Sequence, residues 1–161
     1  MLIITDKQVI GRKEKVDFPS LNLMGVDAKI DTGAYTSALH CHDVRVFKQK
    51  RKTFVSFKLL DPSHPAYNNN QYSLPLYKVK QVKSSFGHSE KRYIIKTTIR
   101  LFDELLDLEL SLADRSKMEY PVLLGRKLLK QRYIVDTDRI NLSQKFVKAR
   151  IKKNKPKHSS T

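Results

Sequence analysis

Residues 26–33 read Val-Asp-Ala-Lys-Ile-Asp-Thr-Gly, an extended apolar run that ends in Asp31-Thr32-Gly33. A glycine after the aspartate permits a tight turn and lets two such loops approach closely. If two such loops bring their aspartates together, two carboxylates about 3 Å apart cannot both ionise, so they share one proton. One can then act as a base on water and the other as an acid on a carbonyl. The run therefore makes Asp31 a candidate catalytic carboxylate, with Thr32 and Gly33 shaping its loop.

Three residues alone are weak support, because Asp and Gly are common wherever a strand enters a turn. The second half of the chain strengthens the interpretation. Residues 121–129 read Pro-Val-Leu-Leu-Gly-Arg-Lys-Leu-Leu, which predicts an apolar strand, a Gly-Arg turn and a short helix. This order of segments resembles that of retroviral aspartic proteases, and the resemblance implies that the apolar strand packs beside the Asp-Thr-Gly loop and supports it.

The rest of the chain is rich in short strands. Alternating or β-branched patterns predict strands over residues 37–47, 53–60, 93–101 and 105–112. Only residues 126–131 show a clear helical pattern, and residues 61–70 carry the Pro and Asn residues of a surface loop. Many short strands separated by turns favour a barrel or sandwich. We therefore expect an all-β closed barrel with one short C-terminal helix.

The ordered motifs resemble those of retroviral aspartic proteases (retropepsins). They are still more similar to a bacterial and archaeal family historically called "ATP-dependent zinc proteases", the RimB-like proteins often encoded beside RimK-type ligases that add glutamate to ribosomal protein. The matching segments are Ala28–Ala34, Thr36–His40, Gly11-Arg12, Gly87-His88 with Glu90 and Arg92, Arg115 with Met118, and Leu123–Arg126 followed by Ile134-Val135-Asp136. Tyr35 departs from the pattern, since an Arg or another polar residue is expected there. The resemblance implies a retropepsin-like (acid protease) β-barrel.

The resemblance also implies an aspartic-type peptidase, a hydrolase that cleaves peptide bonds with water activated by an Asp dyad. The chain holds one Asp-Thr-Gly, and Asp136-Thr137-Asp138 lacks the glycine that a second loop would need. A dyad then requires a homodimer, as in retropepsins. A single-carboxylate enzyme or a scaffold without activity is the alternative. The implied substrates are glutamate-rich or glutamate-extended polypeptides.

Seven further residues are candidates for substrate binding. The resemblance implies that the segment before residue 93 carries the flap that closes over substrate in retropepsins. The arginines among the candidates could bind substrate carboxylates, because a guanidinium group binds a carboxylate through two parallel hydrogen bonds. Ion pairs of the arginines with Glu90, Asp114 or Glu119 are an equally supported reading. The candidates are Ala34, Ser37, His88, Glu90, Arg92, Arg115 and Arg126.

The family name raises the question of zinc and ATP. The sequence has neither an HExxH motif nor a GxxxxGK[ST] loop, so we expect no cofactor and doubt dependence on either. His40 and His42 share one strand face and are the weak candidates for a zinc site. The interpretation favoured over a zinc site is that His40 forms a hydrogen bond and His42 is exposed to solvent.

The chain is a basic protein, with a formal net charge of +16. This excess favours an acidic partner, which could be a nucleic acid such as RNA (including ribosome association), an anionic membrane surface or an acidic polypeptide substrate. A non-catalytic RNA-, ribosome- or peptide-binding module on the same barrel is therefore the alternative function. The basic residues concentrate in residues 45–58 and in 145–161. We expect a protease domain over 1–144 and a basic, disordered tail over 145–161.

The single cysteine, Cys41, excludes an intrachain disulfide and fits a reducing compartment. No run of about 20 apolar residues and no signal-peptide pattern is present, so we expect a cytoplasmic protein without a membrane span.

Overall fold

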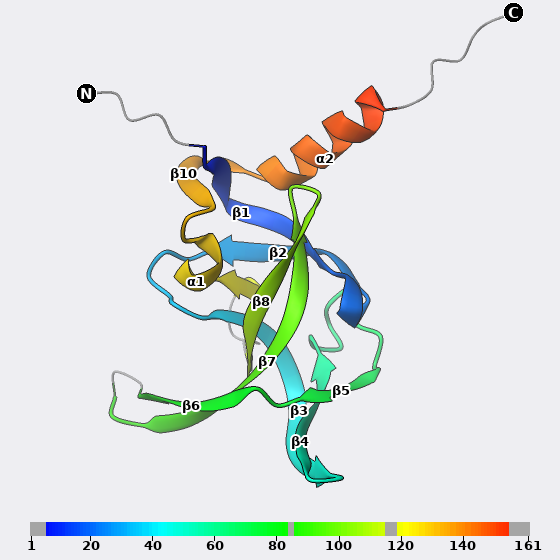
Figure 1. The fold of residues 1–161 in the computed structure, drawn as a ribbon, viewed down its shortest axis with the longest axis vertical. Coiled ribbons are helices and arrows are strands. Elements are labelled where there is room, and N and C mark those ends of the chain that lie inside the picture. The colour runs from blue at the N-terminus through cyan, green and yellow to red at the C-terminus, as the bar shows by residue number, and fades with distance from the viewer. Residues whose placement is uncertain (1–5, 84–85, 115–118, 155–161) are drawn as a thin grey trace, which may run out of the picture.

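The computed structural model describes residues 6–83, 86–114 and 119–154 (Figure 1). The elements in chain order are β1 (Gln8–Phe18), the 3-10 turn η1 (Pro19–Leu21), β2 (Leu23–Ile30), β3 (Ser37–Gln49), β4 (Lys52–Leu59), β5 (Gln71–Pro75), β6 (Lys78–Lys83), β7 (Ser89–Leu101), β8 (Glu104–Ala113), β9 (Val122–Leu124), α1 (Arg126–Leu129), β10 (Tyr133–Ile140) and α2 (Leu142–Lys153). The strands predicted at 37–47, 53–60, 93–101 and 105–112 and the helix predicted at 126–131 are therefore present with small shifts of their ends.

Six strands close into a barrel. Their order is β1-β2-β9-β3-β8-β7, and β7 returns to β1 through the pair Asp17↔Arg100. The other strands lie outside this ring. β10 pairs in parallel with β1, and β6 pairs with β7. β4 pairs with β3 on one side and with β5 on the other. The expected all-β closed barrel with a short helix near its C-terminal end is thus confirmed.

The alternating pattern of the strands explains the core. Along β8 the even-numbered leucines from Leu106 to Leu112 point inward and are nearly fully buried, while Asp107 faces solvent. Phe18, Leu39, Phe57 and Ile99 fill the same interior from other strands. Period-two alternation places one face of each strand in the core, which is why the sequence signal was clear here.

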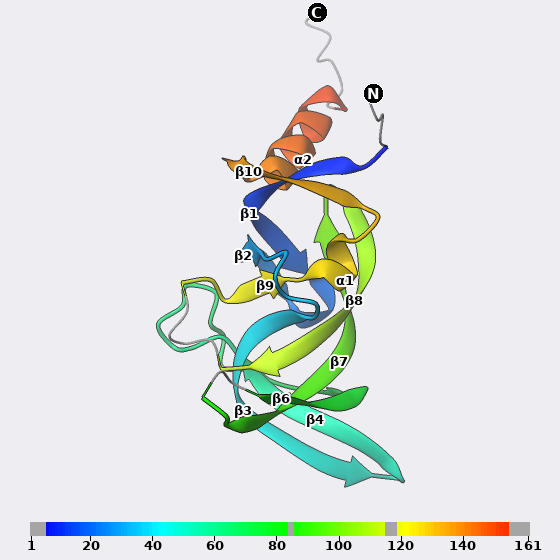
Figure 2. The same cartoon turned by 90° about the vertical axis from the view of Figure 1, so that its left-hand side faces the viewer.

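Helix α2 was not expected from the sequence. Residues 142–153 are helical, so the first part of the segment predicted to be a disordered tail continues as a helix that projects from the barrel (Figures 1 and 2). Its first turn is held by Glu14 of β1, whose carboxylate accepts hydrogen bonds from the backbone N–H groups of Leu142 (3.0 Å) and Ser143 (2.7 Å). The cap is supplied by a distant residue, and a local pattern could not show it.

Among the residues that the structure describes, no helix is long and apolar enough to cross a membrane. The division into a domain over 1–144 and a tail stays a prediction.

Candidate active site

The Asp31 loop begins where β2 leaves the barrel wall. The backbone N–H of Asp31 donates to the carbonyl of Leu124 (2.9 Å), and its carbonyl accepts the N–H of Ala34 (3.2 Å). The N–H of Gly33 donates to Asp31 Oδ1 (2.9 Å), which fixes the orientation of the carboxylate. Asp31 is half-buried, whereas Thr32 and Gly33 are exposed. The loop is therefore tight and rigid at its base, with one carboxylate oxygen held toward the loop backbone.

Strand β9 lies between β2 and β3, and it locks the loop from behind. Ala28, Lys29 and Ile30 pair with Val122, Leu123 and Leu124, and Ala38 pairs with Leu123 on the other side. The segment expected to support the catalytic loop thus occupies the place predicted for it. The two motifs are joined through the barrel sheet rather than through surface contacts.

Gly125 allows the closest part of this contact. A Cβ atom there would lie 2.7 Å from the carbonyl oxygen of Tyr35, so only glycine fits. The N–H groups of Arg126 and Lys127 donate to the carbonyls of Ala34 (2.7 Å) and Tyr35 (3.0 Å). The first turn of α1 therefore holds the far end of the Asp31 loop.

Ser37 is placed behind the loop, with 2% of its surface exposed. Its Oγ accepts the N–H of Gly125 (3.1 Å), so in this chain it positions the loop. Ala34 also contributes its backbone to this support. Their predicted contacts with substrate stay predictions.

Arg126 contacts the loop, and its binding of a substrate carboxylate stays a prediction. Its Nη1 donates to the carbonyl of Thr32 (3.0 Å), and its guanidinium lies 5.8 Å from the centre of the Tyr35 ring. Lys80 of β6 lies 5.4 Å from the centre of the same ring and donates to Thr36 Oγ1 (3.2 Å). Tyr35 and Lys80 were not among the sequence candidates.

For the peptidase activity predicted from the sequence, we expect Arg126→Ala to lower kcat about tenfold or more, because it frees the Thr32 carbonyl beside Asp31. Arg126→Lys should not restore the activity, since a lysine cannot reproduce the planar donor geometry. Steady-state kinetics on a chromogenic peptide, with a thermal melt to check folding, measures this. Lys130→Ala, an exposed change beyond the end of α1, is the matched control. Equal kcat for the Arg126→Ala variant and the wild-type protein would contradict the positioning role.

The flap-like candidates form a pair with each other. Glu90 Oε2 lies 3.0 Å from Arg92 Nη2, on the strand that pairs with β6. The ion-pair reading thus applies to Arg92, and its role in substrate binding stays a prediction. His88 lies just before β7 and is exposed. Arg115 lies outside the described residues.

His40 and His42 have separate partners. His40 is 4% exposed, and its Nε2 lies 3.0 Å from Asp61 Oδ2, while its Nδ1 lies 3.7 Å from Asp114 Oδ1. His42 Nδ1 lies 2.6 Å from the carbonyl oxygen of Leu60. In residues 6–83, 86–114 and 119–154, no three His, Cys, Asp or Glu side chains are grouped to hold a metal ion.

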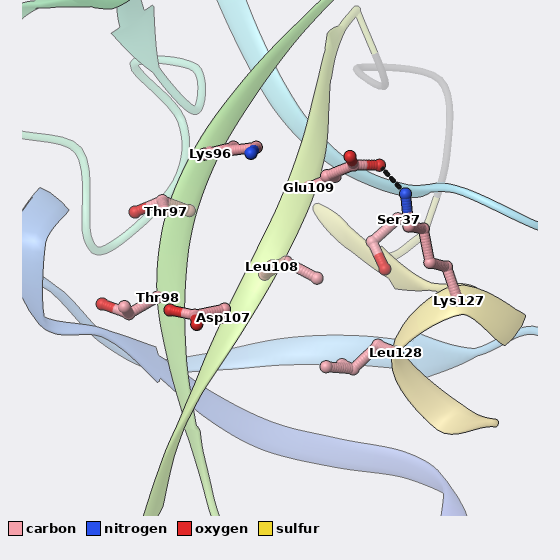
Figure 3. Close-up of a pocket in the computed structure, with 9 residues that line it drawn as sticks. All are labelled: Ser37, Lys96, Thr97, Thr98, Asp107, Leu108, Glu109, Lys127 and Leu128. Carbon is pink, nitrogen blue, oxygen red and sulfur yellow. Dashed lines mark hydrogen bonds and ion pairs between the residues drawn. The ribbon is translucent and has the colours of Figure 1, made fainter. Parts of the chain in front are cut away.

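A pocket of about 500 Å³ lies between β7, β8 and α1 (Figure 3). Lys127 of α1 forms an ion pair with Glu109 of β8, and Lys78 lies 3.8 Å from the same carboxylate. The hydrogen bond from Lys127 lowers the pKa of the Glu109 carboxyl below its ordinary value. The pair therefore stabilises the fold above the ordinary pKa of glutamate, and the stabilisation is lost as the pH falls through the lowered value. The lining residues are Ser37, Lys96, Thr97, Thr98, Asp107, Leu108, Glu109, Lys127 and Leu128.

Cys41 is next to His40 but chemically separate from the loop. It is 1% exposed, and burial raises the pKa of its thiol from 9.0 to about 12. The thiol is therefore protonated and unreactive in the folded protein.

We expect Cys41 to resist alkylation by iodoacetamide at pH 8 until the protein unfolds. Labelling with and without denaturant, followed by mass spectrometry, measures this. Rapid labelling of the folded protein at pH 8 would contradict the burial of Cys41.

Burial also raises the pKa of Tyr133 from 10.0 to about 12. Cys41 and Tyr133 both ionise at a lower pH in the unfolded chain than in the folded protein. The stability of the fold should therefore decrease as the pH rises from about 9 toward 12.

Residues 9–148 match a family model described as RimB-like, "Retropepsin-like aspartic endopeptidase RimB". Two similar curated proteins are each named "Probable alpha-L-glutamate ligase". The protein from Shewanella pealeana is 36% identical over an alignment of 135 residues, and the match covers 81% of this chain and 29% of that protein. The protein from Desulfotalea psychrophila is 32% identical over 134 residues, covering 81% of this chain and 28% of that protein. The chain thus spans less than a third of the length of these relatives.

A solved structure has a similar fold. It is a crystal structure of a protein of unknown function (DUF785) from Legionella pneumophila, with a TM-score of 0.67 and 25% identity. The match covers 86% of this chain and 99% of that one.

Proposed function

This chain belongs to the RimB-like family of retropepsin-like aspartic endopeptidases, and from that premise we propose that it hydrolyses peptide bonds with Asp31 as its catalytic carboxylate. The observation that carries the proposal is the locked Asp31 loop. The carbonyl of Leu124 holds the first end of the loop, the N–H groups of Arg126 and Lys127 hold its far end, and the N–H of Gly33 orients the carboxylate. Nothing in an ordinary strand-to-turn transition requires this close support from a second, distant motif.

The proposed site forms in a homodimer. Asp31 and Asp31 of the partner subunit would face each other across a two-fold axis and share one proton. The ionised carboxylate would take a proton from water, which attacks the peptide carbonyl carbon. The protonated carboxyl would donate its proton to the carbonyl oxygen. Collapse of the tetrahedral intermediate then breaks the C–N bond, with a proton delivered to the leaving amine.

The proposed substrates are glutamate-rich polypeptides. Two cations, Lys80 and Arg126, lie on or beside the backbone that holds the Asp31 loop. The relatives are named glutamate ligases, and polypeptides extended with glutamate would present many carboxylates to such cations. The ligase name belongs to proteins of which the matched segment is only 29%. For this chain we therefore propose cleavage.

Salt tests the acidic substrate. Because the Debye length falls from about 30 Å at 0.01 M salt to about 10 Å at 0.1 M, long-range attraction of an acidic peptide should weaken across this range. We expect KM for a glutamate-rich peptide to rise several-fold while kcat changes little. A neutral peptide of the same length is the control. If the neutral peptide is cleaved equally well at low salt, the acidic-substrate proposal fails and the peptidase proposal stands.

A binding module without catalysis is the second candidate function. It is favoured by five exposed Lys or Arg side chains, which lie in the hairpin formed by the end of β3 and the start of β4. Asp31→Asn separates the two, since only the peptidase loses its activity with this change.

A further inference from the structure

Strands β3 and β4 continue beyond the barrel as a protruding hairpin. Residues 45–56, which we name the basic arm, extend from the end of the molecule opposite α2 (Figures 1 and 2). The register shifts between His42 and Arg45, and Asp43 has a φ of 51°. This bulge bends the strand and directs the arm away from the barrel. The arm lies outside the Asp31 loop and its supports, so the proposed peptidase does not account for it.

The arm carries a concentrated positive charge. It holds five Lys or Arg residues and no acidic residue. All five are exposed, and none forms an ion pair within the part of the chain that the structure describes. A surface with this charge attracts polyanions over a long range.

Two aromatic rings lie among these cations. Phe47 and Phe54 are opposite each other in the β3–β4 register, with ring centres 5.7 Å apart and planes inclined by 19°. Phe47 is 37% exposed although it is a large apolar side chain. Arg45 and Lys52 are two residues from Phe47 and Phe54, and side chains two apart on a strand share one face. One face of the arm therefore presents two stacked rings flanked by two cations.

The turn of the arm keeps a costly conformation. Lys50 and Arg51 form a two-residue turn in which both have positive φ values, 49° and 67°. Asn-Gly or Gly-Gly would adopt this turn with less strain. The arm instead places two more cations at its tip, which agrees with selection for binding over stability.

From these contacts we infer that the basic arm binds single-stranded nucleic acid, with an unstacked base on Phe47 and the phosphates near Arg45 and Lys52. Stacked aromatic platforms between cations suit unpaired bases, whose faces are hidden inside a duplex. An acidic polypeptide would use the charges alone and would gain nothing from the ring.

Fluorescence anisotropy with labelled oligo(U) and oligo(dT) of about ten nucleotides tests this inference. We expect Phe47→Ala to weaken binding about tenfold, and Phe47→Tyr to retain it, because a tyrosine ring can also stack. Arg45→Ala combined with Lys52→Ala should weaken binding and flatten its salt dependence. The two probes show whether RNA or DNA is preferred. Asp31→Asn should bind as the wild type does, which separates this inference from the peptidase proposal.

Lys148→Ala with Lys152→Ala is the matched control, since it removes two exposed cations from α2 at the opposite end. The inference is overturned if this control loses as much affinity as the arm variants, or if Phe47→Ala binds as well as the wild type. Polyglutamate could instead displace the labelled oligonucleotide equally well from the wild-type protein and from the Phe47→Ala variant. That result would identify an acidic polypeptide as the partner. Should Phe47→Ala fail to fold, Lys50→Asn with Arg51→Gly serves in its place. It should raise the melting temperature and weaken binding, because it relaxes the turn and removes both tip cations.

Discussion

Asp31→Asn should lower peptidase activity at least about a thousandfold while leaving the barrel folded. Asparagine keeps the size of the side chain, and its Oδ1 can still accept the N–H of Gly33, so the loop should keep its shape. It can neither take a proton from water nor return one to the carbonyl. Cleavage of a glutamate-rich peptide, followed by mass spectrometry, measures the loss, and a thermal melt checks the fold. Asp138→Asn, on β10, is the matched control.

The same variant distinguishes a shared dyad from a single carboxylate. When equal amounts of wild-type and Asp31→Asn subunits are unfolded, mixed and refolded, about a quarter of random dimers hold two Asp31 residues. Activity should therefore fall to about a quarter if each site needs both subunits, and only to about half if each subunit works alone. EDTA should leave wild-type activity unchanged. Loss with EDTA and recovery with zinc would instead favour a metal at His40 or His42.

The parts of the structure that the sequence could predict are those with local signals. Asp31-Thr32-Gly33 and Leu124-Gly125 are short motifs, and their order along the chain predicted the fold. The alternation of apolar and polar residues predicted β4 and β8. Each of these signals is read from residues that are neighbours in the sequence. The reason that position 125 is a glycine is not local, because a side chain there would meet the carbonyl of Tyr35, which is far away in the sequence.

What the sequence could not show depends on distant partners. Arg126 donates to the carbonyl of Thr32, a contact that no sequence pattern indicated, and its binding of a substrate carboxylate stays a prediction. Ser37 supports Gly125 from a buried position, and its contact with substrate stays a prediction. A side chain's type limits which partners it can bind, but the fold decides which partner is near. The contacts of the Tyr35 ring with Lys80 and Arg126 gave no signal for the same reason.

Glu14 is the clearest of these distant partners. Its side chain is fully buried, yet it carries a carboxylate that accepts three backbone N–H groups, from Gly11 (3.2 Å), Leu142 and Ser143. A buried carboxylate is tolerated only when it is hydrogen-bonded in this way. Through it, β1 holds the start of α2, and the Oγ of Ser143 in turn accepts the N–H of Phe102 (2.8 Å).

Glu14→Gln should destabilise the protein by about 2–3 kcal/mol, because the amide's NH₂ group would face backbone N–H donors and leave at least one of them buried without an acceptor. For a chain of this size, the melting temperature should fall by roughly 10 °C. Urea unfolding and thermal melts measure this, and hydrogen exchange should show that the amides of Leu142 and Ser143 lose protection first. Glu104→Gln, an exposed carboxylate at the start of β8, is the matched control and should change stability by about 0.5 kcal/mol or less. Similar melting temperatures for the Glu14→Gln variant and the wild-type protein would show that α2 is held by its packing on the barrel, through Phe146 against Phe102, and not by the Glu14 carboxylate.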